Sequence, residues 1–332
     1  MKIVLTGSMG HISKPLAVQL LAGGHEVTVI SSKAERKKEI EALGAKALIG
    51  QMEDAEFIAG AFVGAEVVYC MEIIGRHLMT GDDFTLEVMV DKVKKIVTNY
   101  KNAIEKNGIK KVIHLSSIGA HTNEGVGLLA FHFEAEKILG SLPPDVSVKF
   151  MRPVGFYYNL LDNAPMIKQL SKGFVGAFMA LSNYGLGGLL SGKRGVIVSN
   201  YGGKVMNLLV SPLDIATVIA EEMELPFSGR PIRYICSEEL TCDEVAAKIG
   251  KAIGKPYLKW GTISDKMLKD TLVKYKLNPS IALGIVDMGA SGRRGELYTD
   301  YYAHRPKLAP TKLESYLPEF VKAYEAAPDQ ND

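Results

Sequence analysis

Two glycines near the start of the chain have the spacing of a loop that binds phosphate. Gly7 and Gly10 lie in the segment 6–13 (TGSMGHIS), between an apolar strand pattern at 2–5 and a helix pattern that begins at Ser13. Gly7 suits a tight turn, and Gly10 lets the backbone approach a pyrophosphate at the helix N-terminus. We expect Ser13 to cap the helix and the loop to bind a dinucleotide through Gly7, Ser8, Met9, Gly10, His11 and Ile12. The alternative is a strand–helix turn without a ligand.

The end of the second strand pattern carries hydroxyl groups and cations instead of an acidic residue. Ser31, Ser32 and Lys33 follow the apolar run, and Arg36 comes three residues later. An NAD-selective site places Asp or Glu here to bind the ribose 2′-hydroxyl, whereas Lys and Arg suit a 2′-phosphate. We therefore expect Ser32, Lys33 and Arg36 to bind NADP(H), with NAD(H) less favoured. The alternative is an ordinary solvated basic turn.

Polar and aromatic residues also follow the later strand patterns, at the edge where a cofactor would lie. From their positions after the fourth, fifth and sixth strands, we expect contacts to the cofactor from Met71, Glu72, Ser116, Pro153 and Phe156. Aromatic and amide side chains just beyond the sixth strand could flank a planar substrate, and we assign Tyr157 and Asn159 to it. Core packing of the aromatic rings is the alternative.

A histidine on the helix pattern at 128–139 is the best candidate for proton transfer. The ordinary pKa of a histidine, about 6.5, suits His132 to donate a proton, and Ser117 could assist from the end of the fifth strand. Glu136 lies one helical turn further on and could orient His132 or be solvated. The alternative is that His132 forms only a local hydrogen bond. We expect no metal site, because the three cysteines show no metal-ligand spacing.

Alternating strands and helices must position these residues. Apolar strand patterns at 2–5, 27–30, 47–49, 67–71, 111–115 and 146–151 are separated by helix patterns. This alternation predicts an α/β fold with a doubly wound, Rossmann-type parallel sheet. We place an NAD(P)-binding domain at 1–155 and a smaller, mainly helical substrate-facing part at 156–330, with segments crossing between the two.

Composition excludes several classes of protein. A formal charge of +2 over 332 residues, without a basic tail, argues against direct nucleic-acid binding. Three cysteines without metal spacing suit a reducing compartment, and we see no signal peptide before the first strand, so we expect a cytoplasmic location. We expect a small aromatic or quinone-like substrate as partner, and a homodimer is possible.

Glycine is concentrated in one part of the sequence. Nine of the 33 glycines lie between residues 173 and 203, and residues 173–192 carry no charge. Six glycines within those 20 residues argue against a membrane span. We expect this segment to form a mobile, apolar wall over the nicotinamide.

Longer stretches match one known family in the family's order. Besides 6–13 they are 50–54 (GQMED), 64–68 (GAEVV), 111–117 (KVIHLSS), 132–139 (HFEAEKIL), 151–160 (MRPVGFYYNL), 210–216 (VSPLDIA) and 240–246 (LTCDEVA). On these residues the chain resembles the atypical short-chain dehydrogenase/reductase superfamily, in its NmrA-like branch. The resemblance covers nearly the whole length and implies a Rossmann fold with NAD(P) at the carboxyl edge of the sheet.

The resemblance also shapes the expected function. The stretch around His132 looks most like the quinone-oxidoreductase type, and His132 falls near the position of a catalytic lysine in isoflavone-type relatives. Many short-chain dehydrogenases use a Tyr-x-x-x-Lys pair on this helix, and the pair is absent here. We therefore expect an NADPH-dependent reductase of planar, electron-poor acceptors such as quinones. The alternatives are an NADP(H)-sensing regulator without turnover and, third, a sugar-nucleotide epimerase or dehydratase.

Overall fold

A seven-stranded parallel sheet forms the larger of two units in this computed structural model, which describes residues 1–72 and 75–328. The strand order is β3-β2-β1-β4-β5-β6-β10. Their bounds are β1 Lys2–Leu5, β2 Glu26–Ser31, β3 Lys46–Ile49, β4 Val67–Cys70, β5 Lys111–Leu115, β6 Ser147–Pro153 and β10 Ile232–Ile235. The order runs outward in opposite directions from β1 and β4, so a topological switch point lies between them.

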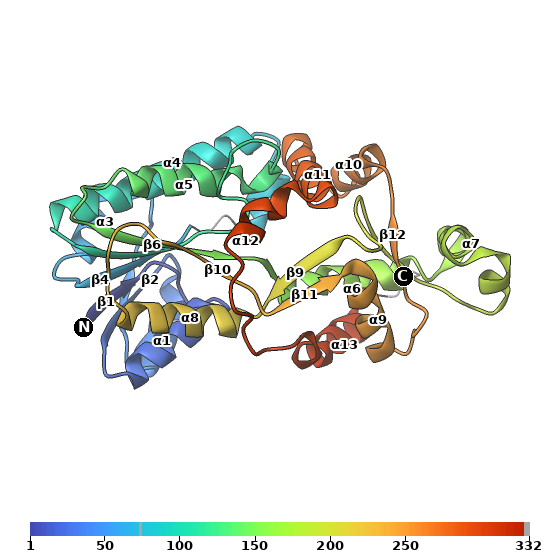
Figure 1. Cartoon of the computed structure of the whole chain (residues 1–332), viewed down its shortest axis with the longest axis horizontal. Helices are drawn as coiled ribbons and strands as arrows, with labels where there is room; N and C mark the ends of the chain where they lie inside the picture. Colours follow the sequence, from blue (N-terminus) through green and yellow to red (C-terminus); the bar gives the residue numbers. More distant parts are fainter. Residues whose placement is uncertain (73–74, 329–332) are drawn as a thin grey trace.

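Helices cover both faces of this sheet. The helices α1 (Ser13–Ala22) and α8 (Pro212–Glu224) pack together on one face, and α3 (Ala55–Ala61), α4 (Leu86–Lys106) and α5 (Ala130–Gly140) cover the other (Figure 1). One apolar core lies on each face, because the continuous apolar strands bury side chains on both sides. The doubly wound α/β fold expected from the sequence is confirmed.

The smaller unit lies beyond the carboxyl ends of the strands. It contains the sheet β11-β9-β7 and the parallel pair β12-β8, with its own apolar core. The strands are β7 Gly155–Phe156, β8 Ile197–Ser199, β9 Met206–Val210, β11 Glu238–Thr241 and β12 Trp260–Thr262. Its principal helices are α6 Asn163–Gln169, α7 Gly173–Leu190, α9 Cys242–Ala252, α10 Asp265–Lys274, α11 Pro279–Arg294, α12 Thr299–Ala303 and α13 Leu317–Ala326. Between them, α8 and β10 return to the larger unit (Figure 1).

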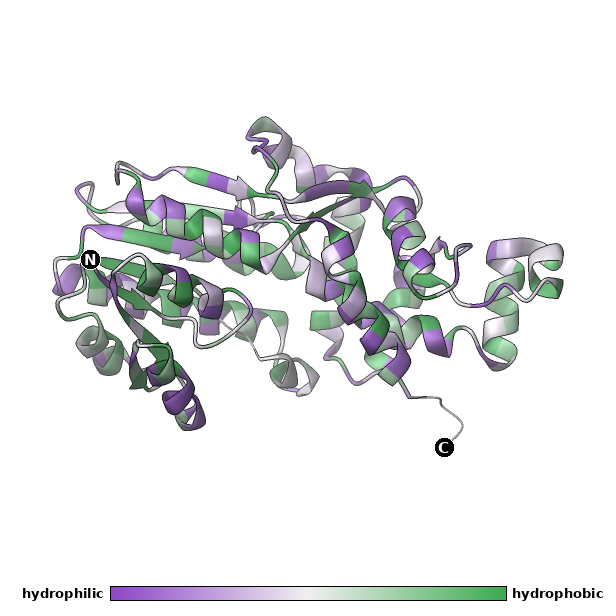
Figure 2. Cartoon of the chain, turned by 90° about the horizontal axis from the view of Figure 1, so that it is seen from below, coloured by the Kyte–Doolittle hydropathy of each residue, from purple (hydrophilic) through white to green (hydrophobic). Residues whose placement is uncertain are grey.

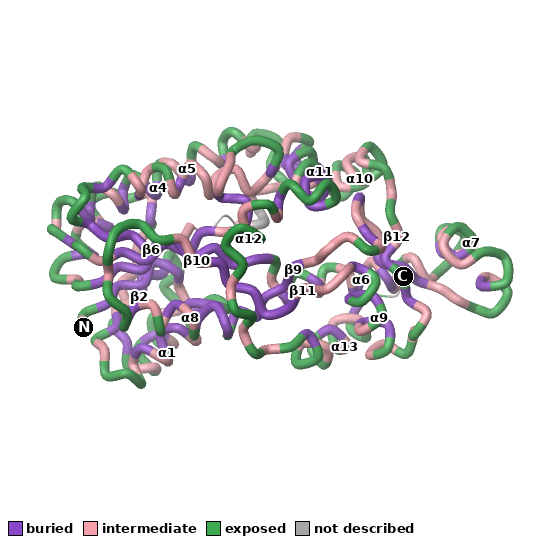
Figure 3. Tube along the Cα trace, in the orientation of Figure 1, coloured by how far each residue is buried: buried purple, intermediate pink, exposed green. Residues whose placement is uncertain are grey.

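The glycine-rich segment does not cover the cofactor edge. α7 projects from the far end of the smaller unit and is largely exposed (Figures 1 and 3). No residue between 164 and 198 lines the cavity at the sheet edge. The expected wall over the nicotinamide is therefore wrong, because α6 packs against α13 and carries the chain away from the sheet before α7 begins.

Candidate functional site

The loop between β1 and α1 lies at the switch point of the sheet. Thr6 donates its backbone N–H to the carbonyl of Tyr69 in β4, and Ser8 donates to that of Ile30 in β2. The loop is thereby fixed between three strands. The side chain of Ser8 is also engaged, since its hydroxyl donates to the hydroxyl of Ser31 at 3.0 Å. The first turn of α1 is thus held above the carboxyl ends of β1 and β4.

The N-terminus of α1 is free to receive an anion. Ser13 does not cap the helix as expected: Ile12 stands at the N-cap without a side-chain hydrogen bond, and the Ser13 hydroxyl donates instead to the Met71 sulfur at 3.4 Å. No acidic residue lies in the first turn. The first N–H groups of the helix therefore suit a phosphate, and the site fits the pyrophosphate of NAD(P)H.

The two loop glycines are needed for different reasons. A Cβ at Gly7 would lie 2.0 Å from the Met71 sulfur, so Gly7 is required by the close approach of Met71. A Cβ at Gly10 would meet nothing within 4 Å, because Gly10 borders the open cavity. Neither residue has a positive φ. Gly7 therefore packs closely against Met71 at the start of the turn, while Gly10 leaves room for a ligand.

The basic residues after β2 form an exposed cluster outside the cavity. The Arg36 guanidinium lies 2.8 Å from Glu39, and the Lys14 ammonium from the first turn of α1 lies 2.9 Å from the same carboxylate. These cations hold the pKa of Glu39 below its usual range. Within the described part of the chain, the Lys33 ammonium forms no hydrogen bond or ion pair, and the residue is exposed. Sequence reasoning did not identify Lys14 or Glu39, which the fold brings to this corner.

A cavity of about 710 Å³ opens at the carboxyl ends of the strands, between the two units. The expected site residues that line it are Gly10, His11, Ile12, Met71, Glu72, Ser116, Ser117, His132, Phe156 and Asn159. Those that do not are Gly7, Ser8, Met9, Ser32, Lys33, Arg36, Pro153 and Tyr157. Met9 is buried in the core, and Pro153 is buried in β6 beside Ile235 of β10.

Tyr157, which we assigned to the substrate, is buried away from the cavity, and its neighbour Tyr158 lines the cavity instead. Tyr157 is buried in the core of the smaller unit, and its hydroxyl donates to Glu238 at 2.7 Å. The ring of Tyr158 lines the cavity and stacks on the His11 imidazole with centroids 4.6 Å apart. Its ring also lies 5.2 Å from that of Phe156. Neighbouring residues here point in different directions, so the choice between two adjacent tyrosines depended on the backbone.

A buried ion pair connects the cavity wall to the core. His114 of β5 and Glu72, after β4, approach to 3.1 Å with both side chains fully buried. Burial would lower the pKa of His114, but the charge and hydrogen bond of Glu72 raise it above its usual value. The structure thus places His114 in the core with an acidic partner that the sequence did not indicate.

His132 lines the cavity as an uncharged imidazole. Burial, together with the nearby charge of His114, lowers the pKa of His132 to about 3. Its Nδ1 atom is buried and has no partner in the described residues, and its ring packs against that of Phe131. An uncharged His132 can share a hydrogen bond at neutral pH, whereas the sequence suggested proton donation by a histidine of ordinary pKa.

Glu136 is held by other groups and does not orient His132. Arg152 of β6 contacts both of its carboxylate oxygens, at 2.8 and 2.6 Å, and the Ser116 hydroxyl donates to it at 2.5 Å. Arg152 also contacts Asp300 of α12 at 2.8 Å. This network fixes Ser116 at the cavity edge and connects α5, β6 and α12.

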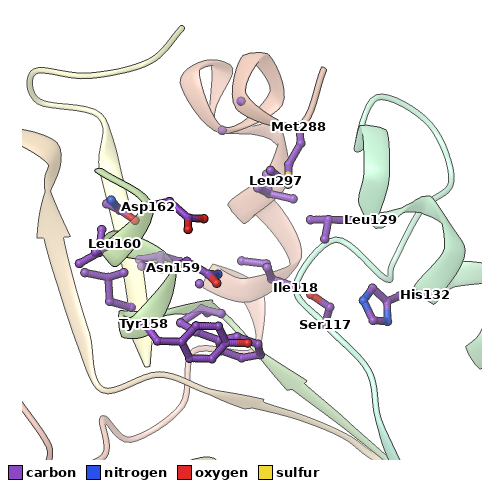
Figure 4. A pocket seen from close by; sticks show the side chains of 18 of the residues that line it. Ser117, Ile118, Leu129, His132, Tyr158, Asn159, Leu160, Asp162, Met288 and Leu297 are labelled. Carbon is purple, nitrogen blue, oxygen red and sulfur yellow. The ribbon is translucent and has the colours of Figure 1, made fainter. Parts of the chain in front are cut away.

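The far wall of the cavity comes from distant parts of the sequence. Figure 4 shows Ser117 and His132 on one side, Tyr158, Asn159 and Asp162 on the other, and Met288 and Leu297 above. The wall residues that sequence reasoning missed include Asp162, Ser199, Tyr201, Asn207, Trp260, Met288, Leu297 and Tyr298. Nothing in their local sequence marks them, because only the packing of the smaller unit brings them together.

Three comparisons with known proteins show the family and the fold of the chain. Residues 7–139 match the model of an NAD(P)H-binding family. A Bacillus subtilis (strain 168) protein named uncharacterized sugar epimerase YhfK is 30% identical over 190 residues, which are 53% of this chain and 82% of that protein.

Solved structures share the fold at low identity. The NADPH complex of an NADPH-dependent quinone oxidoreductase from Escherichia coli has a TM-score of 0.71 at 18% identity, covering 96% of this chain and 99% of that one. A nucleoside-diphosphate-sugar epimerase from Staphylococcus aureus has a TM-score of 0.70 at 16% identity, with coverage of 96% and 99%. The triphenylmethane reductase of Citrobacter sp. with NADP(H) reaches 0.64 at 17% identity, with coverage of 97% and 99%. The chain belongs to this NAD(P)H-binding family, within the atypical short-chain dehydrogenase/reductase superfamily.

Proposed function

We propose that this protein is an NADPH-dependent reductase of planar, electron-poor acceptors such as quinones. The observation that carries the proposal is the apolar surface beside Ser117 and His132, formed by Ile118, Leu129 and Leu297 (Figure 4). A flat apolar ring suits such a wall, because its faces need no hydrogen bonds. The names of the quinone and triphenylmethane reductases that share this fold support the same class of acceptor.

The protein's own groups have defined roles in this proposal. When bound, NADPH supplies the hydride. The N–H groups at the start of α1 bind the pyrophosphate, and Lys33 with Arg36 binds the 2′-phosphate. Ser117 and the neutral His132 donate hydrogen bonds to an acceptor oxygen, while the ring of Tyr158 packs against the acceptor and excludes water.

The protonation states favour acceptors of this kind. His132 is uncharged at neutral pH, and α5 lacks the Tyr-x-x-x-Lys pair of many short-chain dehydrogenases. A quinone that gains a hydride becomes a hydroquinone anion, which takes its remaining proton from water. Its reduction therefore needs no strong protein acid, in contrast to the reduction of a simple ketone.

Stopped-flow oxidation of NADPH against a panel of quinones tests the proposal. We expect saturable turnover that Tyr158→Ala weakens through a higher KM. Absence of turnover above the uncatalysed rate with every quinone would refute it.

An NADP(H) sensor without turnover is the second candidate. The missing Tyr-x-x-x-Lys pair favours it, since a sensor needs no catalytic pair. A sensor should discriminate between NADP⁺ and NADPH in a binding titration and consume neither. A sugar-nucleotide epimerase, suggested by the name of the Bacillus subtilis relative, is disfavoured by the same missing pair.

A further inference from the structure

α7 presents apolar side chains to solvent at the end of the molecule that lies farthest from the central sheet. Phe174 is 87% exposed, and Val175, Phe178 and Leu181 are exposed as well. Positions 174, 178 and 181 follow one face of a helix. Figure 2 shows hydrophobic residues on this projecting segment, and no other part of the described chain covers it in Figure 1. Such a face is costly in water unless it has a partner.

The projecting segment is fixed to the smaller unit and is not a loose tail. Tyr184 donates its hydroxyl to the carbonyl of Gly195 at 2.7 Å, and Lys259 donates to the carbonyl of Asn183 at 3.2 Å. Gly176 and Ala180 form the buried side of the helix. These contacts fix the orientation of α7, so its apolar face remains exposed to solvent.

The segment of the sequence that contains α7 carries charge of only one sign. Between Asp162 and Asp214 the sequence contains no acidic residue, while it carries Lys168, Lys172, Lys193, Arg194 and Lys204. The exposed Lys259 lies beside the Tyr184 ring, with its ammonium 5.6 Å from the ring centroid. The whole chain has a formal charge of only +2, so this segment is much more basic than the rest. Apolar residues bordered by cations suit an anionic lipid surface.

The shape of α7 suits the surface of a bilayer better than its interior. By length and composition alone, α7 is the one helix in the described part of the chain that is long and apolar enough to cross a membrane. Gly185 has φ 68° and ψ −179° and interrupts the helix there. The regular part before Gly185 is about 18 Å long, short of the ~30 Å hydrocarbon core. A short helix bearing Phe and Leu on one face lies in the interface instead.

We propose that α7 docks this protein on membranes that contain anionic lipids, with Phe174, Phe178 and Leu181 inserted at the headgroup boundary. Lys193 and Arg194, which follow α7 in the sequence, supply positive charge that attracts the lipid phosphates. The contact with the bilayer leaves the cavity at the sheet edge open, since α7 does not line it.

Flotation of the full chain with lipid vesicles tests the docking surface. We expect binding to vesicles of phosphatidylcholine with phosphatidylglycerol and much weaker binding to phosphatidylcholine alone. The double variant Phe174→Ser/Phe178→Ser should weaken binding about tenfold or more, because both rings lose their apolar contact. Lys193→Gln should reduce the preference for the anionic vesicles.

Val63→Ser provides the matched control. Val63 is as exposed as the α7 side chains, but it follows α3 in the larger unit. Its variant should bind vesicles like the unchanged chain, and unchanged NADPH binding verifies the fold of every variant. Equal losses in Val63→Ser, or no binding of the unchanged chain to either vesicle, would overturn the proposal. A dimer that the double variant converts to a monomer, without vesicle binding, would assign the face to a second copy and also overturn it.

Discussion

The two sides of the cavity are built in different ways. The cofactor side is a continuous loop, residues 6–13, fixed between β1, β2 and β4. The opposite side, where we propose that the acceptor binds, combines residues from β7, β9, β12 and α11, which together span more than a hundred positions in the sequence. A binding site formed by backbone N–H groups of one loop can thus be predicted from local sequence. A binding site formed by side chains from several elements depends on the whole fold.

The largest effect is expected at the loop. Gly10→Asp would place a carboxylate at the open N-terminus of α1, where nothing within 4 Å opposes the new side chain. We expect the chain to remain folded and NADPH affinity to fall about a hundredfold, because repulsion replaces charge-assisted hydrogen bonds. Calorimetric titration measures this loss. Gly60→Asp, at an equally open glycine on α3, serves as control, and a similar loss there would contradict the assignment.

Substitutions of the two adjacent tyrosines should have different effects, one on the stability of the fold and the other on acceptor binding. Tyr157→Phe leaves the buried carboxylate of Glu238 without one of its donors, so we expect a loss of about 1–3 kcal/mol in the free energy of unfolding. Acceptor KM should stay unchanged. Tyr158→Ala should instead raise acceptor KM with a small effect on unfolding. Denaturation with urea and steady-state kinetics distinguish the two, and a reversed pattern would exclude Tyr158 from the acceptor site.

The basic cluster should tune the choice of cofactor. Lys33→Ala is expected to weaken NADPH binding about tenfold and to leave NADH binding nearly unchanged. Glu39→Gln should strengthen NADPH binding, because it releases Arg36 and Lys14 from their shared carboxylate. Parallel titrations with both cofactors measure this difference. Equal losses of NADPH and NADH would show that no 2′-phosphate lies here.

The smallest effect is expected on the pH dependence of the rate, because His132 does not change its charge near neutral pH. With a pKa of about 3, its charge does not change between about pH 6 and about pH 8. The profile of kcat against pH should therefore have the same shape in the unchanged chain and in His132→Phe over this range. An inflection near pH 6.5 that disappears in this variant would contradict the low pKa.

The same group should influence stability in acid. The unfolded chain binds a proton at His132 near pH 6.5, whereas the folded chain resists it, so this contribution to stability falls as the pH drops below about 6.5. His132→Phe should make the unfolding free energy less dependent on pH in that range. Urea denaturation at several pH values measures the slope.

Sequence patterns predicted the sheet and the position of the loop. They were wrong about which partners some side chains contact. Periodicity placed each strand of the first half because strands buried on both faces are continuously apolar. It could not show that Ser13 turns to the Met71 sulfur instead of capping α1, nor that Glu136 binds Arg152 instead of His132. Those choices depend on partners from other strands and helices.

By itself, the sequence determined the α/β alternation, the phosphate loop and the absence of an acidic residue after the second strand, since these features depend on neighbours along the chain. Only the tertiary structure decided which tyrosine faces the cavity, how burial and His114 keep His132 uncharged, and where the glycine-rich segment lies. The physical reason is that desolvation, charge and packing act through space. The uncharged segment 173–192 thus proved to be an exposed helix at the far end of the molecule instead of a cover for the cofactor.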